Sequence, residues 1–132
     1  MDLLNDVLDA FYYSIIKKID IKLFDKKIIM ELAIIENGLE YSHIVEFDGC
    51  NSFLWIEKQV NNSNFDISKC EYCELTSIIL EKISITTEEE WLKHFSLDYN
   101  IAIEIWDSAL LIQTNTVVID GQEYLLESFI NI

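Results

Sequence analysis

The chain has no proline and only three glycines, Gly38, Gly49 and Gly121, in 132 residues. Linkers and low-complexity segments are usually rich in these residue types, so no boundary between domains is visible. Long apolar runs are also absent, because no stretch approaches the roughly 20 residues that a membrane-spanning helix needs. We therefore expect one domain over residues 1–132 and no membrane partner.

Basic residues are scarce. Nine of them stand against 24 acidic residues, which gives a formal net charge of −15 and a pI near 4.2. Residues 1–27 hold five of each sign, so the whole excess lies in residues 28–132. A field of this sign repels nucleic acid and anionic membranes and attracts basic proteins. The composition therefore predicts a basic protein as partner and excludes nucleic acid.

The high charge does not predict disorder, because disordered acidic chains lack aromatic and β-branched residues. This chain has three Trp, six Tyr and seven Phe, and its mean hydropathy is +0.18. Three cysteines, Cys50, Cys70 and Cys73, make an odd number, for which we expect free thiols. The first six residues are acidic where a secretory signal peptide begins with basic ones, so we expect a cytoplasmic protein.

Apolar residues alternate along much of the chain with the period of two that is typical of half-buried strands. Three residue pairs, Asn37–Gly38, Asp48–Gly49 and Asp120–Gly121, are signals for tight turns. The alternation predicts strands over residues 11–23 (one strand, or two with a break), 28–34, 39–47, 53–56, 74–84, 100–106, 109–114, 116–119 and 122–127. We predict a mainly β fold, with α+β as the alternative, built on an antiparallel, meander-rich sheet.

One or two short helices complete this prediction. Residues 3–11 carry apolar side chains at helical spacing. Thr87 and Glu90 form a capping-box pattern, which predicts a helix that ends near Phe95 and carries Glu88–Glu90 in its first turn. The polar residues 59–71 predict a surface loop.

The residues that could carry chemistry do not form a known motif. Cys70 and Cys73 have the spacing of half a zinc site, but a second pair is missing, and Cys50, His43 and His94 do not complete a standard pattern. We expect no metal and no cofactor. His43 lies on the apolar face of its strand, where a histidine bonded to a main-chain group is the default. No nucleophile-elbow, H-E-x-x-H or P-loop pattern occurs, so we expect no enzyme, although a Cys–His pair or a carboxylate pair assembled in space stays open.

Acidic and aromatic residues gather between positions 88 and 107. Rings framed by acids suit a surface that holds a basic protein, because the rings supply contact area and the acids steer the approach. The alternatives are a solvated helix start for the glutamates and core packing for the tryptophans. The candidate partner-binding residues are Glu88, Glu89, Glu90, Trp91, Asp98, Tyr99, Trp106 and Asp107.

Four segments carry a resemblance to a known class of proteins: Glu46–Cys50, Ser52–Trp55, Tyr72–Ile78 and Glu104–Ala109. They resemble small acidic proteins of bacterial toxin–immunity loci, and the likeness spans most of the chain from about residue 10. The resemblance implies a single-domain cytoplasmic protein that binds and neutralises a partner toxin, and it assigns no functional residues.

We therefore expect a stoichiometric inhibitor of a basic toxin, for which a nuclease fits the charge. The alternative is a non-enzymatic adaptor module that binds a cellular protein. We expect the chain itself to be a monomer or a weak homodimer. An upstream gene for a large secreted protein with a variable C-terminal domain would favour the inhibitor.

Overall fold

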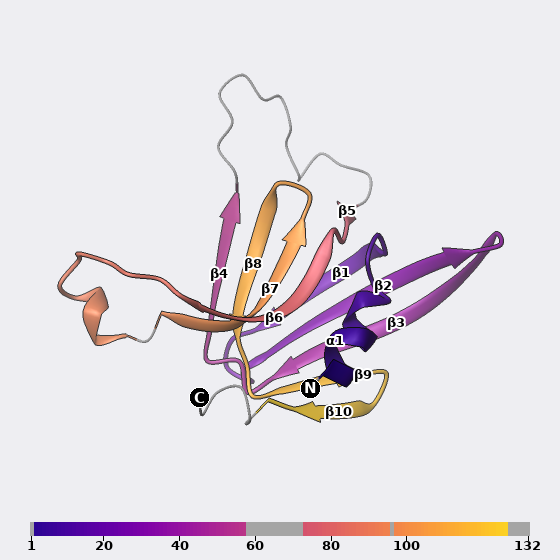
Figure 1. The fold of residues 1–132 in the computed structure, drawn as a ribbon. Coiled ribbons are helices and arrows are strands. Elements are labelled where there is room, and N and C mark those ends of the chain that lie inside the picture. Colours follow the sequence, from indigo (N-terminus) through magenta and orange to yellow (C-terminus); the bar gives the residue numbers. More distant parts are fainter. Residues whose placement is uncertain (1, 58–72, 96, 127–132) are drawn as a thin grey trace, which may run out of the picture.

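The computed structural model describes residues 2–57, 73–95 and 97–126. The predicted loop at 59–71, which includes Cys70, lies outside the described residues. Within them, ten strands form two antiparallel sheets, and the strands of one sheet cross those of the other (Figure 1). One short helix, α1 (Asp2–Asp9), follows the predicted helical spacing at the N-terminal end. No helix in the described part of the chain is long and apolar enough to span a membrane.

The larger sheet has the strand order β10-β9-β3-β2-β1-β5. Two of its three hairpins turn at Asn37–Gly38 and Asp120–Gly121, where all four residues have positive φ, as the predicted two-residue turns require. The third, between β1 and β2, turns over residues 23–26. Its strands are β1 (Ile15–Lys22), β2 (Lys27–Glu36), β3 (Leu39–Asp48), β5 (Cys73–Glu74), β9 (Thr116–Ile119) and β10 (Gln122–Leu125).

The smaller sheet has the strand order β4-β8-β7-β6. Its strands are β4 (Ser52–Glu57), β6 (Ser77–Ser84), β7 (Asp98–Ile105) and β8 (Ser108–Gln113). The main core lies between the two sheets, and in strands such as β7 its side chains come from alternate positions, Ile101, Ile103 and Ile105. A second, smaller buried cluster holds Tyr99, Ala102 and Leu111. The largest fully buried side chains are Phe47, Leu4, Leu8, Ile28, Met30, Leu32, Leu75, Ile78, Ile101, Ile103, Ile105 and Ile112. Three of the core residues, Leu4, Leu8 and Phe11, come from α1 and the turn after it.

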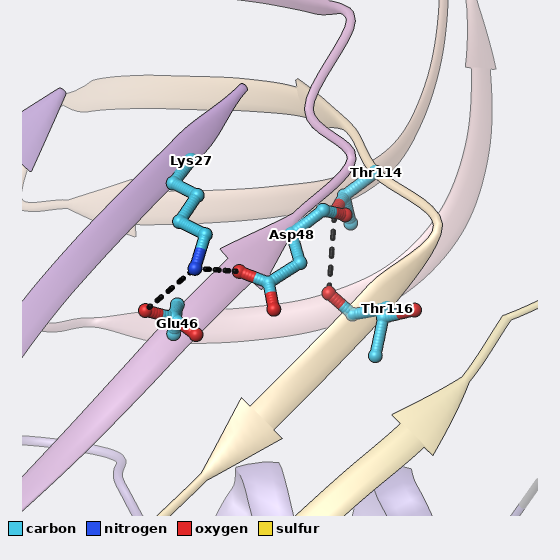
Figure 2. A network of polar contacts seen from close by, with 5 residues as sticks. All are labelled: Lys27, Glu46, Asp48, Thr114 and Thr116. Atoms are coloured by element: carbon cyan, nitrogen blue, oxygen red, sulfur yellow. Dashed lines mark hydrogen bonds and ion pairs between the residues drawn. The ribbon is translucent and has the colours of Figure 1, made fainter. Parts of the chain in front are cut away.

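Among the described residues, three connections link the two sheets: β3 to β4, β5 to β6 and β8 to β9. The first and the last of these form two neighbouring corners. The corners bond to each other: the Asn51 amide donates to the Gln113 carbonyl at 3.1 Å, and the Asn115 amide donates to the Asp48 carbonyl at 3.1 Å. The Thr114 hydroxyl donates to the same Asp48 carbonyl at 2.5 Å (Figure 2). The hydrogen bonds between the two corners therefore help to fix the orientation of one sheet relative to the other.

The mainly β, antiparallel fold with one short helix and a 3₁₀ turn confirms the predicted class. The prediction of a single strand over residues 74–84 is wrong, because β5 and β6 belong to different sheets. Leu75 and Thr76 make the crossing. Leu75 bonds through both its main-chain groups to Tyr13 and Ser14, and Thr76 then donates to the Glu104 carbonyl. The first predicted strand begins only at Ile15, since Phe11 lies in the turn after α1.

The prediction of a helix over residues 87–95 is also wrong, because the helical segment is much shorter. Only Leu92–His94 form a 3₁₀ helix, and the main-chain bonds around it run from each residue to the third one before it. The Thr87 hydroxyl accepts from the Glu89 amide at 3.1 Å, one residue short of the capping-box partner. The three glutamates therefore precede the helical turn and do not form its first turn.

Candidate functional site

The described residues between β6 and β7, 85–95 and Leu97, leave the smaller sheet and project away from both sheets (Figure 1). The base of this excursion is closed by a hydrogen bond from the Ile85 amide to the Leu97 carbonyl at 3.0 Å. We call residues 88–95 the acidic tip. It holds three glutamates, two aromatic rings, Lys93 and His94.

The acidic tip carries an exposed aromatic pair. Trp91 is 64% exposed and Phe95 is 60% exposed, and their rings meet edge to face with centroids 6.2 Å apart. Core packing is therefore the wrong explanation for Trp91. Glu88, Glu89 and Glu90 are all exposed, and only Glu90 forms an ion pair within the described residues, with Lys93 at 3.1 Å. Paired aromatic rings without cover, beside free carboxylates, make a surface suited to a basic protein.

The other candidate residues lie along β7. Asp98 is exposed at the start of the strand, close in sequence to the base of the excursion. Tyr99 is only 3% exposed, and its hydroxyl accepts from the Ser52 hydroxyl at 3.4 Å, so it belongs to the structure of the sheet. Trp106 and Asp107 form the turn from β7 to β8, where Trp106 has φ +53° and its amide donates to the Thr76 hydroxyl.

The structure therefore divides the predicted surface. The seven residue steps of β7 span about 23 Å, so its two ends face different surroundings. The acidic tip and Asp98 lie at one end, and the turn with Trp106 and Asp107 lies at the other. Sequence reasoning missed Phe95, although an aromatic residue four positions after Trp91 in a polar segment was a usable signal.

A second polar group lies at the middle of β3. The Nδ1 atom of His43 is 2.7 Å from one carboxylate oxygen of Asp120, and the Ile44 amide donates to the other at 2.8 Å. The Phe11 ring meets His43 edge to face at 5.3 Å. Burial alone would raise the pKa of Asp120, but its hydrogen bonds to His43 and Ile44 and the charge of His43 lower it. The expected main-chain partner of His43 is therefore wrong, because the contact is with a carboxylate.

Two carboxylates share one lysine where β3 reaches the corner. The Lys27 ammonium lies 3.9 Å from Glu46 and 3.9 Å from Asp48 (Figure 2). Burial, followed by a hydrogen bond and repulsion from Asp48, raises the pKa of Glu46. Lys27 is within ion-pair distance of both acids, so the group is an ion-paired cluster on the outer face of the larger sheet.

The described residues contain no group of three His, Cys, Asp or Glu side chains that could hold a metal ion. Cys50 is buried and Cys73 is partly buried, and neither thiol forms a disulfide. Burial raises the pKa of the Cys50 thiol, which disfavours the reactive thiolate. Cys70 lies outside the described residues, so its distance from Cys73 stays untested.

The comparisons with known proteins place the chain in a family. The model of the YxiG-like protein family matches residues 4–124. The chain therefore belongs to the YxiG-like family, whose description names no activity. No curated protein matches the chain.

Proposed function

We propose that this YxiG-like chain is a cytoplasmic immunity protein that binds and neutralises a basic bacterial toxin in a one-to-one complex. A nuclease is the toxin class that fits the charge best, because the substrate-binding face of such an enzyme is basic. An acidic protein can cover that face in place of nucleic acid. The chain acts by binding, without chemistry of its own.

The observation that carries this proposal is the exposed ring pair of Trp91 and Phe95 on the acidic tip. Folding gains little from rings that keep about two thirds of their surface in water. Tryptophan in a partner's pocket is a common hot spot, and its truncation typically costs at least about 2 kcal/mol of binding energy. The position of the rings therefore suits binding better than it suits folding.

The mechanism has two steps. The net charge of −15 and the free carboxylates of Glu88 and Glu89 steer a basic partner toward the acidic tip. Steering of this kind raises association rates by about 10-fold to 1,000-fold at low salt. The rings of Trp91 and Phe95 then dock against apolar surface between the partner's basic residues, and the bulk of the two sheets blocks entry of its substrate.

The test measures binding kinetics with the partner toxin that the proposal expects, namely the variable C-terminal domain of a large secreted protein whose gene lies next to the gene for this chain. A triple variant, Glu88→Gln, Glu89→Gln and Glu90→Gln, should associate about tenfold more slowly at 0.1 M salt, with little change in dissociation. The difference in association rate between the triple variant and the wild type should vanish at 1 M salt, where the Debye length falls to about 3 Å. The matched control removes three exposed charges elsewhere: Glu31→Gln, Glu104→Gln and Glu123→Gln.

A single-ring variant tests the docking step. Trp91→Ala should speed dissociation by about 30-fold, the kinetic equivalent of a 2 kcal/mol hot spot. Phe24→Ala is the matched control, because Phe24 is a fully exposed ring on the β1–β2 turn. Equal association rates for the two triple variants, together with equal dissociation for the two ring variants, would place the interface away from the acidic tip.

A further inference from the structure

The outer edge of β3 is open along half of its length. We propose that this edge binds an extended segment of a basic protein by strand addition, so that the segment becomes a new strand of the larger sheet. The β2–β3 hairpin carries the edge beyond the rest of the sheet (Figure 1). The edge consists of the outward main-chain groups of residues 39–43.

The strand register determines which main-chain groups face outward. Glu36 and Leu39 flank the two-residue turn and form a hydrogen-bonded pair, so the pairs Ile34–Tyr41 and Leu32–His43 are hydrogen-bonded as well. The amides of Tyr41 and His43 therefore point toward β2. Those of the alternate residues in β3 point away from β2.

Strand β9 covers only part of this outer side, because it pairs with β3 over Val45–Asp48. Asp120 then ends the ladder: its carboxylate accepts from the Ile44 amide, and its own amide donates to the Ile44 carbonyl at 2.9 Å. The next outward residues are Ser42 and Glu40. Within the described residues, no hydrogen bond to the amide of either one is present, and both side chains are exposed.

The open edge lacks the features that usually prevent unwanted strand pairing. Proteins protect such edges with lysine, proline, a bulge or a cover. β3 contains no lysine and no proline, and the bulge in this sheet lies in β1, between Ile16 and Lys18. Leu39, Tyr41 and Ile44 are exposed hydrophobic residues along the strand. The edge therefore keeps both the hydrogen-bonding groups and the apolar side chains that an added strand uses.

Charge selects the occupant. A second copy of this chain would bring another net charge of −15 to the edge, which opposes self-association. Around the edge, Glu36 and Glu40 are exposed, and among the described residues Lys17 is the lysine paired there, 3.0 Å from Glu40. A segment with lysine or arginine at alternate positions complements this surface.

A cavity on the same hairpin offers a place for one basic side chain. It has a volume of about 250 Å³ and is lined by Ile34, Glu36, Tyr41 and His43. The aliphatic stem of a lysine or arginine can lie on Ile34 and the Tyr41 ring, with its charged end beside Glu36. In strand addition, main-chain bonds supply affinity and such side-chain cavities supply specificity.

This edge is separate from the acidic tip, since the hairpin and the 85–97 excursion project from opposite sides of the molecule (Figure 1). The proposal therefore does not depend on the proposed function. A basic protein with an exposed extended segment is sufficient, whether or not it is a toxin.

The test uses ¹⁵N-labelled protein and an eight-residue peptide in which arginine alternates with valine. At saturation, hydrogen exchange should slow at least about tenfold at the Glu40 and Ser42 amides. Exchange at Tyr41 and His43 should stay unchanged, because their amides already bond to β2. A peptide with prolines in place of two central valines keeps its charge but cannot form the ladder, and it should not protect the edge. Protection without this alternation, or equal protection by the proline peptide, would overturn the proposal.

Two protein variants complete the test. Ser42→Pro removes an outward amide without touching the bonds to β2, and it should weaken peptide binding at least about fivefold, whereas Ser42→Thr should not. Glu36→Gln should weaken binding more than Glu31→Gln, which lies on the opposite face of the same strand. Trp91→Ala should bind the peptide normally. If both Ser42→Pro and Glu36→Gln bound the peptide as tightly as the wild type, strand addition by a basic segment would be refuted here. A wild-type dimer that the Ser42→Pro substitution dissociates would refute it too, because the edge would then bind a second copy of this chain.

Discussion

Adding one methyl group at the corner between β3 and β4 tests how firmly the two sheets are joined. Gly49 has φ +65°, and a Cβ atom there would lie 2.7 Å from the side-chain Nδ2 atom of Asn115 and 3.2 Å from the Asn115 Cβ. The side-chain nitrogen can rotate away. The Asn115 Cβ cannot, because the Asn115 main chain donates to Asp48 and accepts from Leu126.

The magnitude follows from two terms. A left-handed conformation costs a non-glycine residue about 1–2 kcal/mol, and the loss of chain entropy in the unfolded state returns about 0.4–1 kcal/mol. Overpacking against Asn115 adds about 1–3 kcal/mol. We therefore expect Gly49→Ala to lower the free energy of unfolding by about 1–5 kcal/mol, most of it from the overpacking.

Gly38→Ala is the matched control. Gly38 has φ +78° in the β2–β3 turn, but no atom lies within 4 Å of its added Cβ, so only the conformational term applies. Urea denaturation of both variants in parallel should show a loss for Gly38→Ala of about 1 kcal/mol or less. Equal losses for Gly38→Ala and Gly49→Ala would refute the close approach of the two corners.

Three further predictions concern titratable groups. The pKa of Asp120 is lowered from 3.8, so its contacts stabilise the fold above that pH. Asp120→Asn should therefore have a lower free energy of unfolding than the wild type at pH 7. In urea denaturation, this difference should disappear as the pH falls below 3.8. The pKa of Glu46 is raised from 4.5, so its charged form is disfavoured, and Glu46→Gln should gain a few tenths of a kcal/mol at pH 7 but nothing below pH 4.5. Cys50 is buried with a raised thiol pKa, so iodoacetamide should label it only in urea, as mass spectrometry of the labelled peptides would show.

Local patterns made the strands and turns predictable. Alternating side chains and the Asn37–Gly38 and Asp120–Gly121 turns are short-range signals, and both hairpins occur where they were expected. The division into two sheets was not predictable in this way. The crossing at Leu75 depends on main-chain bonds to Tyr13 and Ser14, which lie about sixty positions earlier and leave no local pattern.

The candidate surface was predictable only in part, for the same reason. The acids and Trp91 of the acidic tip stand together in sequence and remain together in the structure. In the sequence, Tyr99 and Trp106 resemble Trp91 as aromatic neighbours of acidic residues. In the structure, Tyr99 is buried in β7, and Trp106 lies just past the end of β7 that is far from the acidic tip. Asp120 was assigned only to a turn, because its contact with His43 joins residues 77 positions apart.

Titration of toxin activity is the most direct test of the central proposal that this chain is a stoichiometric inhibitor. The partner toxin that the proposal requires is held at a fixed concentration far above the dissociation constant, and increasing amounts of the chain are added. We expect a linear fall in toxin activity that reaches zero at one chain per toxin. Loss of activity at a small fraction of one equivalent, which would require turnover, or full toxin activity at excess chain, would contradict it.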